Sequence, residues 1–273
     1  DLLIRDGRIS AIGTGLAAEG EKTLDLGGDL LLPGFVDVHI HAFKGMDTMQ
    51  GEEAVRHMSR ELKKVGVAAF LPTTMSASPE DTVKALEGIK AVMDRPEPDG
   101  AIVLGAHMEA PFLAEAKAGA QLKQYFADPN EENWQRYTGG LESIVRLITM
   151  APERAGALDF IRELTKKGIT VSIGHTTADA ETTHAAAEAG ATHVTHTFNA
   201  QTPLNHRAPG VPGAALVDDR LQCEVISDGI HLHPDIVKLI IRTKGGEKLV
   251  AITDAMEAAG MPDGQYQLGG QDV

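Results

Sequence analysis

Six histidine, glutamate and aspartate residues have the types and the spacing expected of metal ligands. They are His39, His41, Glu109, His175, His196 and Asp254. His39 and His41 are two residues apart, so on a β-strand their side chains point to the same side. Neutral imidazoles and carboxylates together suit a borderline divalent ion such as zinc or iron(II), and cysteine is not needed. The set predicts a metal centre, provided that the fold brings its members together.

The residues that position this set form a regular alternation of strands and helices. Apolar, β-rich runs begin near Val36, Ala68, Ile102, Val145, Thr170, His193, Leu221 and Lys248. The intervals between them leave room for crossover helices, which allows parallel connections. Eight such units predict an eight-stranded β/α (TIM-type) barrel, whose chemistry is placed at the C-terminal ends of its strands.

The six candidate ligands all follow predicted strands. A single histidine or aspartate at a strand end is weak evidence, because such residues are often hydrogen-bonded core or capping residues. Joint placement at the ends of five strands strengthens the prediction of a metal centre. His107, two residues before Glu109, is expected to orient the Glu109 carboxylate as a supporting residue.

Helix boundaries support the same count of units. Ser78 before Pro79 predicts a helix from there to about Asp94, and His233 before Pro234 predicts another. Gly66, Gly168 and Gly190 are expected to end helices before the next strand. The polar stretch Lys117–Gly140, with its one proline, its glycines and its aromatic residues, is expected to be a long active-site loop.

Composition excludes several classes of protein. The 273 residues are 42% hydrophobic and carry 39 acidic against 25 basic residues, a net charge of −14. This charge argues against non-specific binding to nucleic acid or to an anionic membrane. The single cysteine, Cys223, excludes an intrachain disulfide framework, and no apolar run has the length of a membrane span. A cytoplasmic protein is expected.

A second pattern concerns an anionic ligand. The stretch Ala191–Val217 contains no Asp or Glu, where the average density predicts about four. It includes Asn199, His206 and Arg207, and a guanidinium in an acidic protein can bind an anion with two parallel hydrogen bonds. His231, at the end of the seventh strand, adds a second group at the same rim. A chance acid-free loop is the alternative.

Seven segments together resemble a known family. They are Pro33–His41, His107–Phe112, Gly174–Thr176, His196–Ala200, Arg207–Gly210, Asp228–His231 and Thr253–Ala255. In order, they are similar to the motifs of the N-acetylglucosamine-6-phosphate deacetylases of the amidohydrolase superfamily. The resemblance covers essentially the whole chain.

The resemblance implies a barrel with a small β-sandwich domain, and hydrolysis of N-acetylglucosamine 6-phosphate to glucosamine 6-phosphate and acetate by a metal-activated water. It implies that Glu109, His175 and His196 hold the principal ion, and that His39 and His41 can hold a second ion with Glu109 shared. Asp254 would be the general acid and base. Gln121 would donate to the oxyanion, and Arg207 with His231 would hold the phosphate. The substrate contacts that it implies are Ala120, Gln121, Asn199, Ala200, Arg207 and His231. A homodimer or homotetramer is implied as well, with zinc or iron as the metal.

Three departures from the family pattern concern Ala110, where the family usually has Gly, Gln201, where it often has Met, and the end of the chain. Family members continue through a final helix and the returning half of the small domain. We therefore expect residues 1–33 to be part of a small β domain, 34–256 to be the barrel and 257–273 to begin an incomplete return, in a chain truncated at its C-terminus.

Other functions stay open at this point. A cyclic-amide hydrolase would need a bridging lysine at the end of the fourth strand, and Ile148–Glu153 contains none. A deaminase, or a deacetylase of a related N-acetylhexosamine 6-phosphate, is a further alternative. From a different class, the chain could be a catalytically incomplete barrel that binds a sugar phosphate.

Overall fold

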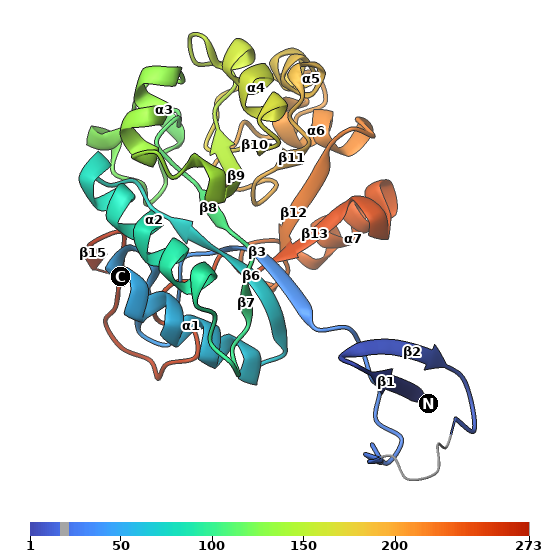
Figure 1. The fold of residues 1–273 in the computed structure, drawn as a ribbon. Helices are drawn as coiled ribbons and strands as arrows, with labels where there is room; N and C mark the ends of the chain where they lie inside the picture. Colours follow the sequence, from blue (N-terminus) through green and yellow to red (C-terminus); the bar gives the residue numbers. More distant parts are fainter. Residues whose placement is uncertain (17–21, 273) are drawn as a thin grey trace. The chain divides into compact units, whose positions relative to one another are not determined.

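The computed structural model describes residues 1–16 and 22–272 and divides the chain into two units, Asp1–Pro33 and Gly34–Val273 (Figure 1). In the first unit, β1 (Leu2–Arg5) and β2 (Arg8–Ile12) pair in antiparallel register. The turn between them is Asp6–Gly7, where both residues have positive φ. The two short strands that the sequence predicted are confirmed. Residues 17–21 and Val273, which belong to the predicted segments 1–33 and 257–273, lie outside the described residues.

The second unit is built on a parallel sheet of eight strands in chain order. These are β3 (Phe35–Ile40), β6 (Val67–Thr74), β8 (Ala106–Met108), β9 (Val145–Met150), β10 (Thr170–Ile173), β11 (His193–Val194), β12 (Gln222–Ile226) and β13 (Leu249–Ile252). The short strand β7 (Ile102–Val103) pairs with the first half of β6. All eight predicted strand positions are confirmed, as is the β/α barrel.

The first and last barrel strands are joined by side-chain and main-chain hydrogen bonds that also position the site. The Asp254 amide donates to the His39 carbonyl at 2.9 Å, and the Thr253 hydroxyl donates to the buried Asp37 carboxylate. Burial raises the pKa of Asp37, and the hydrogen bonds from Thr253 and His39 oppose that rise. The closure therefore places the C-terminal ends of β3 and β13 side by side.

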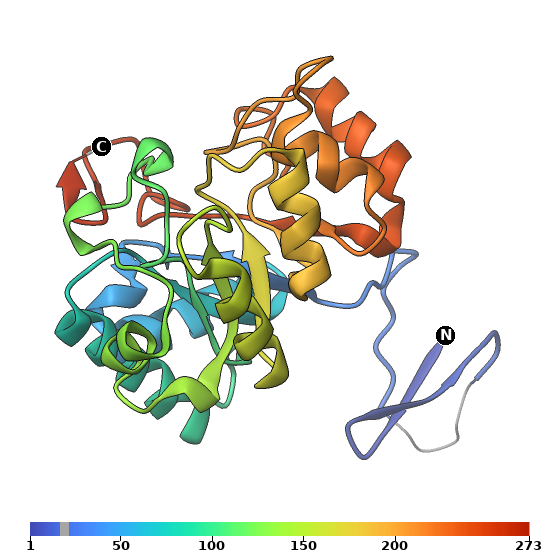
Figure 2. The same ribbon diagram turned by 90° about the horizontal axis from the view of Figure 1, so that it is seen from above.

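Among the described residues of the second unit, seven helices alternate with the strands. They lie on the outside of the sheet (Figures 1 and 2). They are α1 (Glu52–Lys64), α2 (Pro79–Asp94), α3 (Glu131–Thr138), α4 (Ala157–Lys166), α5 (Ala180–Ala189), α6 (Gly210–Val217) and α7 (Pro234–Lys244). The Ser78 side chain accepts from the Asp81 amide, and the His233 ring accepts from the Asp235 amide. Both predicted helix starts are confirmed. Among the described residues, no helix combines the length and the apolar character needed to cross a membrane.

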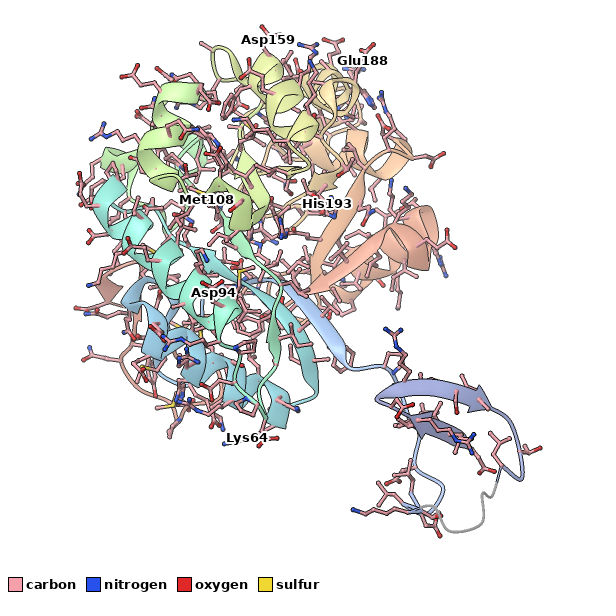
Figure 3. All side chains as sticks on the ribbon, in the orientation of Figure 1. Lys64, Asp94, Met108, Asp159, Glu188 and His193 are labelled. Atoms are coloured by element: carbon pink, nitrogen blue, oxygen red, sulfur yellow. The ribbon has the colours of Figure 1, made fainter. Side chains whose placement is uncertain are left out.

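The prediction of an active-site loop over Lys117–Gly140 is wrong for its second half, which forms α3. Trp134 is fully buried against Phe160, which also packs edge-to-face on Phe112 with 5.5 Å between ring centroids. Asn130 caps the helix, and Gly139 ends it in the left-handed region. Figure 3 labels Met108, which is buried on β8, and Asp159 and Glu188, which are exposed on α4 and α5. Trp134 and Tyr137 belong to the core, because α3 turns both side chains inward.

The remaining elements are short. Two antiparallel pairs join β4 (Ala42–Phe43) with β5 (Met46–Asp47) and β14 (Gln267–Leu268) with β15 (Gln271–Asp272). Single 3₁₀ turns cover Thr48–Gln50, Glu115–Lys117, Lys123–Tyr125, Glu142–Ile144 and Gly246–Lys248. The Gln271 amide donates to the Ala120 carbonyl at 2.9 Å. The segment 257–272 thus contacts the loop after β8, and no helix forms in its described residues.

Candidate metal centre and active site

All six candidate ligands meet at the C-terminal rim of the barrel. They form two groups, His39 with His41 and Asp254, and Glu109 with His175 and His196. Within each group one ligand atom per residue lies within 4.8 Å of the others. The structure therefore brings together every residue that the sequence predicted for the metal centre.

One carboxylate, that of Glu109, joins the two groups. Glu109 Oε1 lies 3.1 Å from His175 Nε2, 3.2 Å from His196 Nε2 and 3.3 Å from His39 Nε2. Glu109 Oε2 lies 3.0 Å from His41 Nε2. Asp254 Oδ1 lies 3.3 Å from His39 Nε2 and 3.2 Å from His41 Nε2. Glu109 is thus shared by the two groups, as a bridging ligand would be.

The four imidazoles are oriented by hydrogen bonds at their other ring nitrogen. His41 Nδ1 lies 3.3 Å from the Thr73 carbonyl, and His175 Nδ1 lies 2.7 Å from the Lys117 carbonyl. His196 Nδ1 lies 3.2 Å from the Asn199 carbonyl, and His39 Nδ1 lies 3.1 Å from Glu224 Oε2. Since these oxygens only accept, each Nδ1 is the donor, and each Nε2 faces the centre. Such partners are typical of histidines that bind metals.

This donor set fits a divalent ion. An ion with four ligands at about 2.0–2.1 Å separates those ligands by roughly 3.3 Å, and His175 Nε2 lies 3.1 Å from His196 Nε2. His39 Nε2 is buried and lies 3.3 Å from two carboxylate oxygens, yet it has no hydrogen-bond partner with suitable alignment among the described residues. Four imidazoles and two carboxylates at such distances match the preferences of zinc and iron(II).

Protons occupy part of this centre in the metal-free chain. Burial alone would lower the pKa of the His41 imidazole, but its hydrogen bonds to Asp254 and Glu109 raise that pKa to about 9. Burial alone would lower the pKa of His196, but its hydrogen bond to Glu109 and the charges of Asp254 and Glu109 together raise it. A metal ion requires deprotonated imidazoles and must displace these protons.

Metal affinity is therefore expected to weaken as the pH falls below about 9, the folded-state pKa of His41. Zinc binding at neutral pH should release protons, since His41 is protonated in the metal-free chain below that pH. Titration calorimetry in buffers of different protonation enthalpy measures the protons released, and a competing chelator gives the affinity from pH 6 to 9. An affinity that is constant over this range would contradict the proton competition.

The main chain is strained at the centre. His175, His196 and Asp254 have φ values of 46°, 28° and 49°, in the left-handed region that side chains other than glycine seldom adopt. Phe198 and Ala200 share this feature in the turn after His196. Gln201 stabilises that turn, because its side-chain amide donates to the Thr195 carbonyl at 2.7 Å and its side-chain oxygen accepts from the Phe198 main-chain amide. Such strain is concentrated at functional sites.

The residues expected to contact substrate near the metal centre are partly in place. The buried Gln121 amide donates to Glu109 Oε2 at 2.6 Å, and its oxygen accepts from the Ser76 amide. Asn199 is half-buried, and its Nδ2 has no hydrogen-bond partner among the described residues. The Ala200 carbonyl accepts from the Thr176 amide, while the Ala120 carbonyl accepts from Gln271.

The expected phosphate ligands lie on exposed loops. Arg207, between β11 and α6, makes no hydrogen bond or ion pair with any residue that the structure describes. His231 follows β12 and is exposed, with its Nδ1 2.7 Å from Asp228 Oδ2. Hydrogen bonds from the His231 and Ile230 amides lower the pKa of Asp228 to about 2. No contact among the described residues joins Arg207 or His231 to the metal ligands.

Sequence reasoning was wrong about His107 and missed two acids. The His107 nitrogens lie 3.2 Å from the Thr73 hydroxyl and 2.9 Å from the Thr149 hydroxyl, so the ring does not orient Glu109. It packs edge-on against His39, with 4.5 Å between ring centroids. Glu224 and Asp37 were missed, although each is an acid inside an apolar strand and fully buried acids need partners.

Comparison with known proteins identifies the family. The sequence model of the amidohydrolase family matches residues 30–262. The chain belongs to the amidohydrolase family.

Within that family, the chain is similar to deacetylases of amino-sugar phosphates. It is 40% identical to the N-acetylglucosamine-6-phosphate deacetylase of Bacillus subtilis (strain 168), over 99% of this chain and 69% of the relative. It is 36% identical to the N-acetylgalactosamine-6-phosphate deacetylase of Escherichia coli O157:H7, over 100% of this chain and 71% of the relative. A solved structure is also similar, that of a variant of the Mycobacterium smegmatis N-acetyl-D-glucosamine-6-phosphate deacetylase in complex with N-acetyl-D-glucosamine-6-phosphate. It has a TM-score of 0.88 and 36% identity, over 99% of this chain and 70% of that one.

Proposed function

We propose that this chain hydrolyses the acetamide of N-acetylglucosamine 6-phosphate to glucosamine 6-phosphate and acetate. The observation that carries the proposal is the meeting of four histidines and two carboxylates at the rim of the barrel. Each histidine Nε2 lies 3.0–3.3 Å from a carboxylate oxygen of Glu109 or Asp254. It is supported by 40% identity to a named deacetylase over nearly the whole chain.

Zinc or iron is the ion that this centre would hold. Glu109, His175 and His196 would bind the principal ion, and His39 with His41 would bind a second one that shares Glu109. When bound, a divalent ion lowers the pKa of water and polarises a carbonyl group.

Asp254 would act as general base and then as general acid. Its Oδ1 lies at the centre, and its side chain retains 20% exposure, so a substrate can reach it. Burial alone would raise the pKa of Asp254, but the charges of His39 and His41 hold it below its usual value. The carboxylate can therefore accept the proton of the attacking water and deliver it to the amine nitrogen as the carbon–nitrogen bond breaks.

The remaining residues would hold the sugar phosphate. The Gln121 amide, beside Glu109, would donate to the developing oxyanion. Asn199, whose Nδ2 has no partner in the part of the chain that is described, and the main chain at Ala120 and Ala200 would contact the sugar. Arg207 and His231 would bind the phosphate and so fix the acetamide over the metal centre.

Acetate release from the phosphorylated and unphosphorylated sugar tests this function. Arg207→Ala is expected to lower kcat/KM for N-acetylglucosamine 6-phosphate by about 10- to 100-fold, since hydrogen bonds to charged groups contribute about 1.5–3 kcal/mol. Rates on the unphosphorylated sugar should not change. Arg242→Ala, an exposed arginine on α7, is the matched control.

Metal content must be measured on the same samples. Equal rates on the two sugars would contradict the phosphate role of Arg207. Metal-free protein that releases no acetate after zinc or iron is added would favour the alternative of a non-catalytic barrel that binds a sugar phosphate.

The galactosamine epimer is the second candidate substrate, because the E. coli relative is named for it. The same assay with N-acetylgalactosamine 6-phosphate compares the two sugars, and the larger kcat/KM identifies the substrate.

We also propose a localisation, an oligomeric state and domain boundaries. A homodimer or homotetramer in the cytoplasm is proposed, and the buried free thiol of Cys223 is in keeping with a reducing compartment. Residues 34–256 would form the catalytic barrel, 1–33 would belong to a small β domain and 257–273 would begin a return to it. Light scattering with size exclusion measures the oligomeric state.

A further inference from the structure

Glu224 lies in the middle of β12 and is fully buried. Its neighbours along the strand, Cys223 and Val225, are buried and apolar. A buried carboxyl group costs free energy unless it is hydrogen-bonded. The partners of Glu224 therefore show what this residue does.

A single oxygen of Glu224 contacts both ligand groups. Oε2 lies 3.1 Å from His39 Nδ1 and accepts from the His196 main-chain amide at 3.2 Å. His39 belongs to the group with Asp254, and His196 belongs to the group with His175. The Glu224 carbonyl also accepts from the Thr197 amide at 2.9 Å. The residue thus fixes His39 by its ring and His196 by its main chain.

His39 differs from the other three ligand histidines in how its ring is held. The Nδ1 atoms of His41, His175 and His196 face main-chain carbonyls, which no substitution removes. His39 Nδ1 faces the side chain of Glu224. Without that acceptor, the ring would be free to carry its proton on Nε2 or to rotate. Either change would remove the Nε2 lone pair from the centre.

Glu224 also stabilises the main chain of His196. Its φ of 28° is positive, as are those of His175 and Asp254, and surrounding contacts must hold such a conformation. The bond from its amide to Glu224 Oε2 is one of these contacts, and the adjacent bond from Thr197 to the same residue is another.

We propose that Glu224 is a positioning residue for the whole metal centre. It keeps the proton of His39 on Nδ1, so that Nε2 faces Glu109 and Asp254, and it holds the strained main chain at His196. One side chain thereby sets the distance between the two ligand groups. The inference rests on the proposed metal centre, but it does not depend on which amide the enzyme hydrolyses.

Zinc affinity tests the role of Glu224. Glu224→Met has a similar length and no acceptor, and it is expected to weaken zinc binding by about 10- to 100-fold, the usual effect of losing a partner of a metal-binding histidine. Glu224→Gln keeps an accepting oxygen and should bind within a few-fold of the parent. A competing chelator measures affinity for the tightest zinc site, and histidine ¹⁵N shifts report the His39 tautomer.

The matched control is Asp218→Asn. Asp218 is a buried acid that lies 2.8 Å from His184 Nδ1 and also pairs with Arg220, without contact to any candidate ligand. It should lose melting temperature while keeping zinc affinity and the His39 shifts. Parental affinity and an unchanged His39 tautomer in Glu224→Met would overturn the proposal.

Two further measurements keep the test decisive. If circular dichroism shows that Glu224→Met does not fold, Glu224→Asp replaces it, because the shorter side chain withdraws the oxygen from both donors. An affinity loss of at least about 10-fold is then expected, and parental affinity would overturn the proposal. Acetate release by the parent chain is measured separately, so a failure of the proposed activity is distinguished from a failure of this inference.

Discussion

Asp254→Asn is expected to lower kcat for acetate release by about 10²- to 10⁴-fold, the usual contribution of a positioned general acid and base. The amide cannot accept the proton of the attacking water. It has the same shape as the carboxylate and keeps an oxygen at the position of Oδ1, which lies 3.2–3.3 Å from His41 and His39. Zinc content and KM should therefore stay close to those of the parent. Steady-state kinetics with metal analysis measures all three.

Asp235→Asn is the matched control for this variant, because Asp235 is an exposed acid in the first turn of α7. Its kcat should equal that of the parent. A near-parental kcat in Asp254→Asn would exclude Asp254 as the proton carrier. Loss of zinc together with kcat would instead make Asp254 a required ligand, in line with its position beside His39 and His41.

The meeting of the six candidate ligands could be predicted from the sequence, because these residues lie at or near strand ends. Parallel strands of a barrel all end at the same rim, so residues that directly follow different strands must meet there. This holds for Glu109 after β8 and for His175 after β10. No distance had to be known, since the topology brings the residues together.

The supporting residues could not be predicted in this way, because their partners are set by packing inside the barrel. Glu224 is 185 positions from His39 along the chain, and Asp37 is 216 positions from Thr253. An acidic residue inside an apolar strand is unusual, so the sequence singles out Glu224 and Asp37, but it does not identify their partners. His107 shows the same limit. Its spacing to Glu109 suggested a contact between the two side chains, but its ring nitrogens contact Thr73 on β6 and Thr149 on β9 instead.

The helix α3 was missed for a different reason. Its eight residues are short for a periodic pattern, and only Trp134 and Tyr137 among them are large core residues. Packing of Trp134 on Phe160 stabilises the helix. This contact joins α3 to α4, which are separated along the chain by β9. Tertiary contacts therefore decided this element.

Glu109→Gln is expected to remove bound metal and to lower acetate release by about 10³-fold, since Lewis-acid stabilisation contributes several kcal/mol and each 1.36 kcal/mol is about tenfold. Glu109 Oε1 lies within 3.3 Å of three Nε2 atoms, and Oε2 lies 3.0 Å from a fourth. An amide there has no charge to share between two ions and presents N–H groups to nitrogens that must bind metal. Metal analysis and kinetics on the same preparation check both expectations.

His41→Gln is the comparison that separates the two ligand groups. His41 contacts Asp254 and Glu109 Oε2, but it has no contact with His175 or His196 among the described residues. If the groups hold separate ions, this variant keeps the ion of Glu109, His175 and His196, so it retains one equivalent of metal and part of the activity. A complete loss of metal in His41→Gln would show that the six residues form one indivisible site, and parental metal content in Glu109→Gln would refute its role as the shared ligand. The pair of variants therefore decides between one ion and two, because Glu109 alone among the described residues has carboxylate oxygens within 3.3 Å of Nε2 atoms in both groups.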